Sequence, residues 1–252
     1  MALTLLGRRR ALVLACLLAL LVAYGASAGH LPELPSELDV VFYVAVLLPA
    51  FAAAIWLALP LAHTGTRTLL VLTAVAGVLA ALLVLLDVDS VANVAKLACY
   101  SLAGFAFLSL FEELWWLTLV AVLVPWVDIW SVAAGPTEYV VEERPGIFDN
   151  VAVRFPSPGE SAAISVGPPD ILFFALFLAA ADRFGLRVAG TWVGMTACLG
   201  VTLALVWHWD DVAGLPALPA VCVGFLLPNA DLLWRDLRRA RARPPSETDD
   251  RL

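Results

Sequence analysis

A series of eight long apolar runs, separated by short polar turns, limits how this chain can fold more than any other feature. A helix needs about 20 residues to cross the ~30 Å hydrocarbon core of a bilayer, and the runs have about that length. They cover approximately residues 10–28, 39–62, 68–86, 91–111, 114–134, 169–186, 189–208 and 214–234. The runs are continuous rather than alternating, and a backbone in lipid must satisfy its own hydrogen bonds, so helices are favoured over strands. The sequence therefore predicts an all-α polytopic membrane protein with about eight transmembrane helices.

The composition supports this class. The chain has 252 residues, of which 62% are hydrophobic and only 15% are charged, whereas a soluble domain has roughly 45–50% apolar residues. We expect the lipid bilayer as a partner and no nucleic acid, because the charges lie in turns and tails. The sequence indicates no oligomeric state. The cysteines lie inside apolar runs without a CxxC pair, so we expect no disulfide, no metal and no cofactor. They are Cys16, Cys99, Cys198 and Cys222.

The chain divides into four parts on this pattern. Residues 1–134 hold the first five helices, and residues 135–168 form a polar loop. Two short stretches of the loop, 150–155 and 161–166, have strand character and could pair as a small hairpin. Residues 169–234 hold the last three helices. The remaining residues, 235–252, form a basic tail that we expect to be disordered beyond Pro244.

Basic residues near the ends of the runs predict the orientation. Three arginines (Arg8, Arg9 and Arg10) precede the first run, Arg67 lies in the second turn, and further arginines follow the sixth and eighth runs. Because basic residues collect on the cytoplasmic side, we expect both termini in the cytoplasm, with the loop 135–168 outside and the protein in the plasma membrane. An alternative is that the first run is a cleavable signal peptide ending near Ala28, which would leave seven spans.

Two aspartates stand inside or beside apolar sequence at the ends of the polar loop. A charged residue in the middle of a bilayer costs about 2.5–3.5 kcal/mol on insertion scales, so it suggests a functional site. Asp128 lies seven residues before Gly135, or about 10 Å along a helix. Asp170 opens the next helix. A proline motif, residues 215–219, opens the last helix from the same side of the membrane. Taken singly, each feature has an ordinary structural explanation. Asp128 could be an aspartate at a helix end, Asp170 an acid in a first helical turn, and the prolines a helix start.

Together these residues suit the hydrolysis of a peptide bond. Two neighbouring carboxylates cannot both ionise readily, so one holds a proton while the other is charged. The charged carboxylate can draw a proton from water, and the protonated one can donate to the carbonyl oxygen of the substrate. Pro216 and Pro219 remove backbone donors and leave irregular backbone that could meet an extended substrate.

The sequence resembles presenilins and signal peptide peptidases over residues ~112–234. Leu-Pro-Ala-Leu-Pro matches the PAL motif of presenilins, and Gly-Pro-Pro-Asp resembles the GxGD motif of both groups. Asp128 resembles their first catalytic aspartate. The resemblance implies a presenilin-like bundle and an intramembrane aspartyl protease that cleaves transmembrane-helix or signal-peptide substrates with Asp128 and Asp170. It also implies that the two motifs bind the substrate. Their residues are Gly167, Pro168, Pro169, Leu215, Pro216, Ala217, Leu218 and Pro219.

The sequence departs from these families at three points. Val127 stands where the family has tyrosine, Pro169 stands where it has the second glycine, and eight runs replace nine spans. Two alternatives therefore stay open. One is a catalytically inactive relative that binds helices, and the other is a proton- or ion-coupled transporter that uses the same carboxylates. A transporter of this kind would predict repeated halves, which the sequence lacks.

Overall fold

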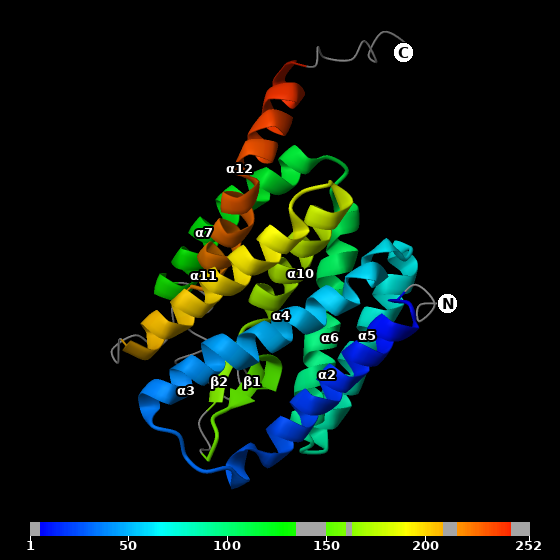
Figure 1. Cartoon of the computed structure of the whole chain (residues 1–252). Coiled ribbons are helices and arrows are strands. Elements are labelled where there is room, and N and C mark those ends of the chain that lie inside the picture. Colours follow the sequence, from blue (N-terminus) through cyan, green and yellow to red (C-terminus); the bar gives the residue numbers. More distant parts are fainter. Residues whose placement is uncertain (1–5, 135–149, 160–162, 209–215, 243–252) are drawn as a thin grey trace.

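The protein is a bundle of helices with one small sheet (Figure 1). The computed structural model describes residues 6–134, 150–159, 163–208 and 216–242. Its helices are α2 (Arg8–Ser27), α3 (Ser36–Phe42), α4 (Leu48–Ala58), α5 (Thr66–Leu85), α6 (Asp89–Phe107), α7 (Leu114–Ala134), α10 (Pro168–Arg183), α11 (Val188–His208) and α12 (Leu218–Ala242). A π-helical turn, Tyr43–Leu47, joins α3 to α4 without a break. Short 3₁₀ turns extend α2, α4 and α6.

Six helical segments of the described residues are long and apolar enough to cross a membrane. They are Arg8–His30, Glu37–His63, Thr66–Leu85, Asp89–Leu110, Leu114–Ser131 and Val188–Val206. The prediction of an all-α membrane protein is therefore confirmed at this level. The helix α10 has only 16 residues. The helix α12 ends in a strongly charged stretch. The count of eight spans accordingly stays a prediction.

The two ends of the bundle differ in what they carry. One end holds the antiparallel strands β1 (Val153–Pro156) and β2 (Ala163–Val166), with Arg154 opposite Ser165 (Figure 1). We call it the hairpin end. The strands overlap the two stretches in which the sequence shows strand character, while residues 135–149 and 160–162 lie outside the described part. Because only Gly167 separates β2 from α10, the hairpin delivers the chain directly to the start of that helix.

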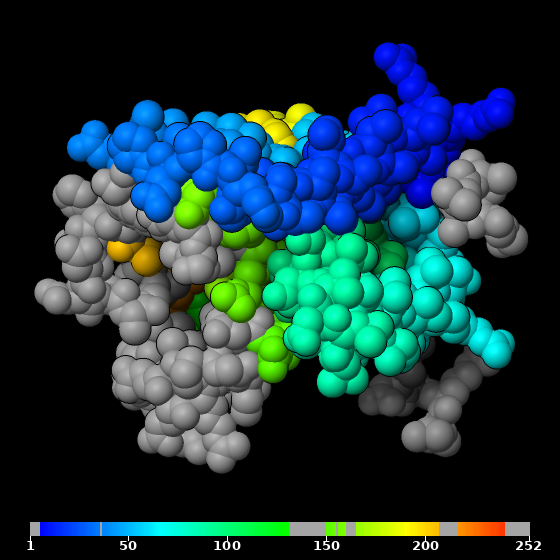
Figure 2. Space-filling model, turned by 90° about the horizontal axis from the view of Figure 1, so that it is seen from below, coloured from blue at the N-terminus to red at the C-terminus, as the bar shows by residue number. Residues whose placement is uncertain are grey.

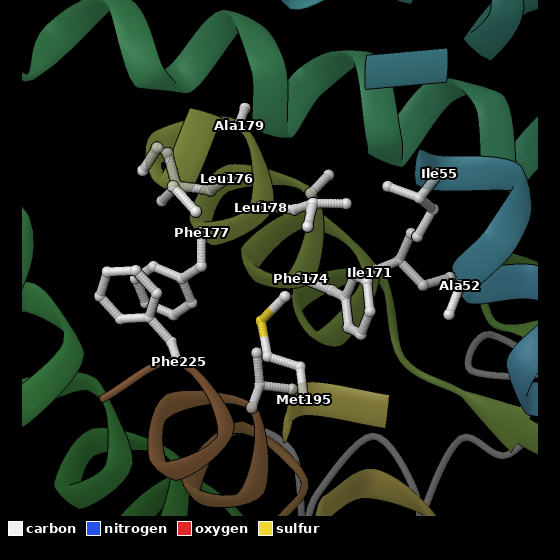
Figure 3. Packing of buried hydrophobic residues seen from close by; sticks show 14 of the residues in the cluster. Ala52, Ile55, Ile171, Phe174, Leu176, Phe177, Leu178, Ala179, Met195 and Phe225 are labelled. Carbon is white, nitrogen blue, oxygen red and sulfur yellow. The ribbon is translucent and has the colours of Figure 1, made fainter. Parts of the chain in front are cut away.

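The helix α10 lies inside the bundle. Every residue from Phe174 to Ala181 is buried, and α6, α11 and α12 all pack against this helix. Figure 3 shows Ile171 facing Ala52 and Ile55 of α4. On another side of α10, the rings of Phe177 and Phe225 stack with their centroids 4.6 Å apart. A helix that is apolar on all sides is surrounded by protein or by lipid, and here much of α10 is surrounded by protein.

Glycines bring the helices around α10 close together. A Cβ atom on Gly104 of α6 would lie 2.3 Å from the carbonyl oxygen of Leu172. Where α11 crosses α12, a Cβ atom on Gly194 would lie 2.4 Å from the carbonyl oxygen of Gly224. Small residues let helix backbones approach, which is how helices in membranes pack without a hydrophobic driving force between them.

The last helix is longer than the apolar pattern indicates. The apolar run ends near residue 234, but α12 continues through Ala242. The added stretch consists mainly of arginine and alanine, which favour helix even where no apolar face requires one. Residues 243–252 of the predicted tail lie outside the described part.

Candidate aspartate site

Asp128 is half-buried on α7, and its carboxylate contacts the start of α12. Oδ2 of Asp128 accepts a hydrogen bond of 3.1 Å from the backbone N–H of Leu218. The two helices pack along one another, which brings together residues 90 positions apart in the chain. Pro125, three residues before Asp128, lies inside α7. It leaves one carbonyl of the preceding turn without its helical partner.

Asp170 lies in the first turn of α10. Its Oδ2 accepts a hydrogen bond of 3.2 Å from the backbone N–H of Gly167, the residue that caps the helix. Pro168 and Pro169 are the first two residues of the helix, where proline is well tolerated because their N–H groups would have no helical partner. Proline in place of the second glycine of GxGD is therefore compatible with this helix and with the position of Asp170.

Asp128 and Asp170 stand on two helices, α7 and α10, that both pack against α12. These two helices lie on opposite sides of the polar loop in the sequence. Each carboxylate accepts one hydrogen bond through Oδ2. In the described part of the chain, neither Oδ1 accepts another. One oxygen of each carboxylate is thus held, and the other is available.

The proline motif lies at the start of α12. Pro216 and Ala217 precede the helix and are half-buried, Leu218 is its first residue and is buried, and Pro219 is its second. Leu215 lies outside the described residues. Because the Leu218 amide donates to Asp128, the motif supplies a hydrogen bond to the aspartate site in addition to starting a helix.

Asp170 also borders a small apolar pocket with a volume of about 40 Å³. The pocket lies between the π-helical turn, α4, α10 and α11, and Asp170 is the only charged residue among the described residues that line it. Tyr43 lines it as well, and the Tyr43 hydroxyl shares a hydrogen bond of 3.0 Å with Oγ of Ser157, next to β1. A pocket of this size has room for water molecules. We call it the Asp170 pocket.

A row of polar side chains on α6 holds the segment that leads to the hairpin. Lys96 is 6% exposed, and its Nζ donates to the carbonyl oxygen of Ala152 over 3.0 Å. Tyr100 donates to Val151, and Asn93 accepts from the N–H of Arg154. These residues are not among those predicted from the sequence to form a site. Their spacing could have indicated a shared role, because positions 93, 96 and 100 lie on one face of a helix.

Comparisons of the chain with protein-family models, with curated proteins and with solved structures found no match. The case for a function therefore rests on the residues and their geometry.

Proposed function

We propose that the protein is an intramembrane aspartyl protease of the presenilin and signal peptide peptidase type, with Asp128 and Asp170 as its catalytic pair. The observation that carries the proposal is that two carboxylates from separate apolar helices each accept a hydrogen bond from the backbone of one of the two motifs, at Leu218 and at Gly167. An acid inside a membrane protein is costly and tends to be kept for function. A pair of such acids, on α7 and α10, meets the requirement of peptide hydrolysis for two carboxyl groups.

In the proposed reaction, the pair shares one proton. The charged carboxylate accepts a proton from a water molecule as the water oxygen attacks the peptide carbonyl carbon. The other carboxylate donates its proton to the carbonyl oxygen as negative charge develops there. Collapse of this intermediate breaks the C–N bond, and the leaving nitrogen takes up a proton. No metal or organic cofactor is needed.

Two backbone amides orient the pair. The N–H of Leu218 holds Asp128, and the N–H of Gly167 holds Asp170. Both bonds use Oδ2, so each Oδ1 can face the water or the substrate. Such fixed donors keep the carboxylates in place before the substrate arrives, which reduces the reorganisation needed during the reaction.

The substrate is a single transmembrane helix or a signal peptide that unwinds near the site. An extended peptide must have its backbone hydrogen bonds satisfied inside the membrane, and strand addition satisfies them. We place this strand beside residues 164–166 of β2 or beside the backbone of the proline motif. Pro216 and Pro219 can accept but not donate, so pairing with the motif would be one-sided.

We propose that the protein has eight spans in a presenilin-like bundle. Both termini lie in the cytoplasm, and the protein lies in the plasma membrane. This arrangement follows the arginine distribution of the sequence. In the structure, Arg67 lies in the first turn of α5 and Arg187 lies between α10 and α11. Figure 1 shows the start of α5 and the α10–α11 connection at the end opposite the hairpin. The hairpin end would then face outward.

A second candidate is a catalytically inactive relative that binds helices. The hydrogen bond between Gly167 and Asp170 favours it, because a capping role alone would keep an acid in the first turn of a helix. It does not account for the hydrogen bond that Asp128 accepts from the proline motif, for which catalysis supplies a reason.

Incubation of the purified protein with a membrane-embedded peptide substrate in liposomes tests the proposal. The wild type should produce two fragments whose masses sum to the substrate plus one water. Asp170→Ala should produce none. Asp182→Ala, which changes an acid at the other end of the same helix, should cleave like the wild type. Binding of the peptide without cleavage by the wild type would favour the inactive relative.

A further inference from the structure

A second, polar cavity lies at the hairpin end, apart from the aspartate pair. Its volume is about 350 Å³. It is bounded by the end of α2, the turn between α5 and α6, the first turns of α6, and the segment that leads into β1. Figure 2 shows these segments meeting on this face, with α2 in dark blue, the start of α6 in blue-green and the segment before β1 in light green. We call it the polar cavity.

Two cations line the polar cavity. Lys96 is almost fully buried and donates to Ala152. Arg154 is half-buried, and in the described part of the chain its guanidinium group makes no hydrogen bond. Asn93 and Ser90 add polar groups from the first turns of α6. The N-terminus of that helix contributes further positive potential. This part of the cavity suits an anionic group such as a phosphate.

Two acids also line the polar cavity. Asp87 lies in the turn between α5 and α6, Asp89 is the first residue of α6, and both are exposed. A ligand with only negative charge would be repelled by these acids, and a ligand with only positive charge would be repelled by Lys96 and Arg154. A ligand with a buried negative group and an outward positive group satisfies both sets, because each charge then lies near its opposite.

The remaining lining is mostly apolar, with Tyr24 and Asn150 as its polar members. Leu21 of α2 and Val84 of α5 are among its apolar residues. Their neighbours Leu20 and Leu85 are strongly exposed, on helices that are long and apolar enough to cross a membrane. Such side chains face lipid in a membrane. The polar cavity therefore opens toward acyl chains as well as toward water.

We propose that the polar cavity binds the headgroup of a zwitterionic phospholipid. Its phosphate faces Lys96 and Arg154, and its ammonium group faces Asp87 and Asp89. The acyl chains lie along α2 and α5. This site does not depend on the protease proposal. The lipid would tie β1, through Arg154, to the start of α6, so its binding should stabilise the hairpin end.

Native mass spectrometry and thermal unfolding of the purified protein in detergent test this site. The probes are phosphatidylethanolamine, phosphatidylglycerol with the same acyl chains, and free glycerophosphoethanolamine. The variants are Arg154→Gln and Asp87→Asn. Asparagine suits position 87 because the backbone there has a φ of 55°, which asparagine adopts more readily than most residues. Arg67→Gln, at the opposite end of the bundle, is the control.

We expect the wild type and Arg67→Gln to retain phosphatidylethanolamine in preference to phosphatidylglycerol and to unfold at a higher temperature with it. Arg154→Gln should bind it several-fold more weakly, and Asp87→Asn should lose the preference. Stabilisation by glycerophosphoethanolamine alone would support the same chemistry with a soluble source of the headgroup. Equal retention of both lipids by wild type and Arg154→Gln would overturn the proposal, because it would indicate only the ordinary lipid layer around the helices.

Discussion

The backbone N–H of Leu218 lies 3.1 Å from Oδ2 of Asp128 and donates a hydrogen bond to it. This bond connects the proline motif to the first aspartate of the candidate site. It gives the motif a role that helix initiation does not require, because the first N–H groups of a helix can be satisfied in many other ways. It also provides a way to separate the two roles by mutation.

Replacing Leu218 with proline should lower peptide cleavage by about tenfold or more relative to Leu218→Ala, since a hydrogen bond to a charged group contributes about 1.5–3 kcal/mol. Proline removes the N–H but suits the first position of a helix, and α10 already begins with two prolines. Alanine keeps the N–H and loses only the side chain. Initial rates in liposomes give the comparison. Equal rates for the two variants would show that the hydrogen bond has no part in the reaction.

Much of the fold follows from the sequence because continuous apolar runs translate directly into helices in a membrane. The six membrane-crossing segments and the sharp break near Glu112 and Glu113 could be predicted in this way. The contact between Asp128 and Leu218 could not, because it depends on how α7 packs along α12. The enclosure of α10 was equally hidden, since an apolar run looks the same whether lipid or protein surrounds it.

The residues of the candidate site could be predicted from the sequence, but the contacts that they make could not. The order of Asp128, Asp170 and the proline motif placed them on one side of the membrane by topology alone. The hydrogen bonds from α6 to residues 151–154 were not foreseen, because their acceptors are mostly backbone carbonyls, which carry no sequence signal. The hydrogen bond of Lys96 is the clearest example of a contact that the sequence does not predict, since a lone lysine in an apolar run has several structural explanations.

Lys96→Met should destabilise the protein by about 1–3 kcal/mol, because it leaves a buried carbonyl oxygen, that of Ala152, without its donor. Val91→Met is the control, since Val91 is exposed on the same helix. Unfolding temperatures in detergent give the comparison. If the two variants melt alike, the hydrogen bond between Lys96 and Ala152 contributes little to stability.

Gly104→Ala should also destabilise the bundle, by about 1–3 kcal/mol, because an added methyl group at a tight contact forces neighbouring helices apart. Here the methyl would meet the carbonyl of Leu172, on the helix that carries Asp170. Gly29→Ala adds a methyl group where nothing lies within 4 Å and should have little effect. An unfolding temperature of Gly104→Ala equal to that of the wild type would contradict the close packing of α6 on α10.

The proposed orientation predicts which turns react with a membrane-impermeant thiol reagent added to intact cells. In a background without native cysteines, Asp87→Cys at the hairpin end should be labelled from outside. Arg67→Cys, in the first turn of α5 at the opposite end, should be labelled only after the membrane is opened. The reverse pattern would place the hairpin end in the cytoplasm.

The measurement that tests the central claim most directly is the cleavage rate of Asp128→Asn, Asp170→Asn and the double variant, in the same liposomes with the same peptide. If the two carboxylates act as one catalytic unit, each single substitution removes nearly all activity, by ~10²-fold or more, and the double variant is no slower than either single one. All three proteins should unfold at temperatures close to that of the wild type. Cleavage at the wild-type rate by either single variant, or a double variant slowed by the product of the two single effects, would contradict a shared catalytic site.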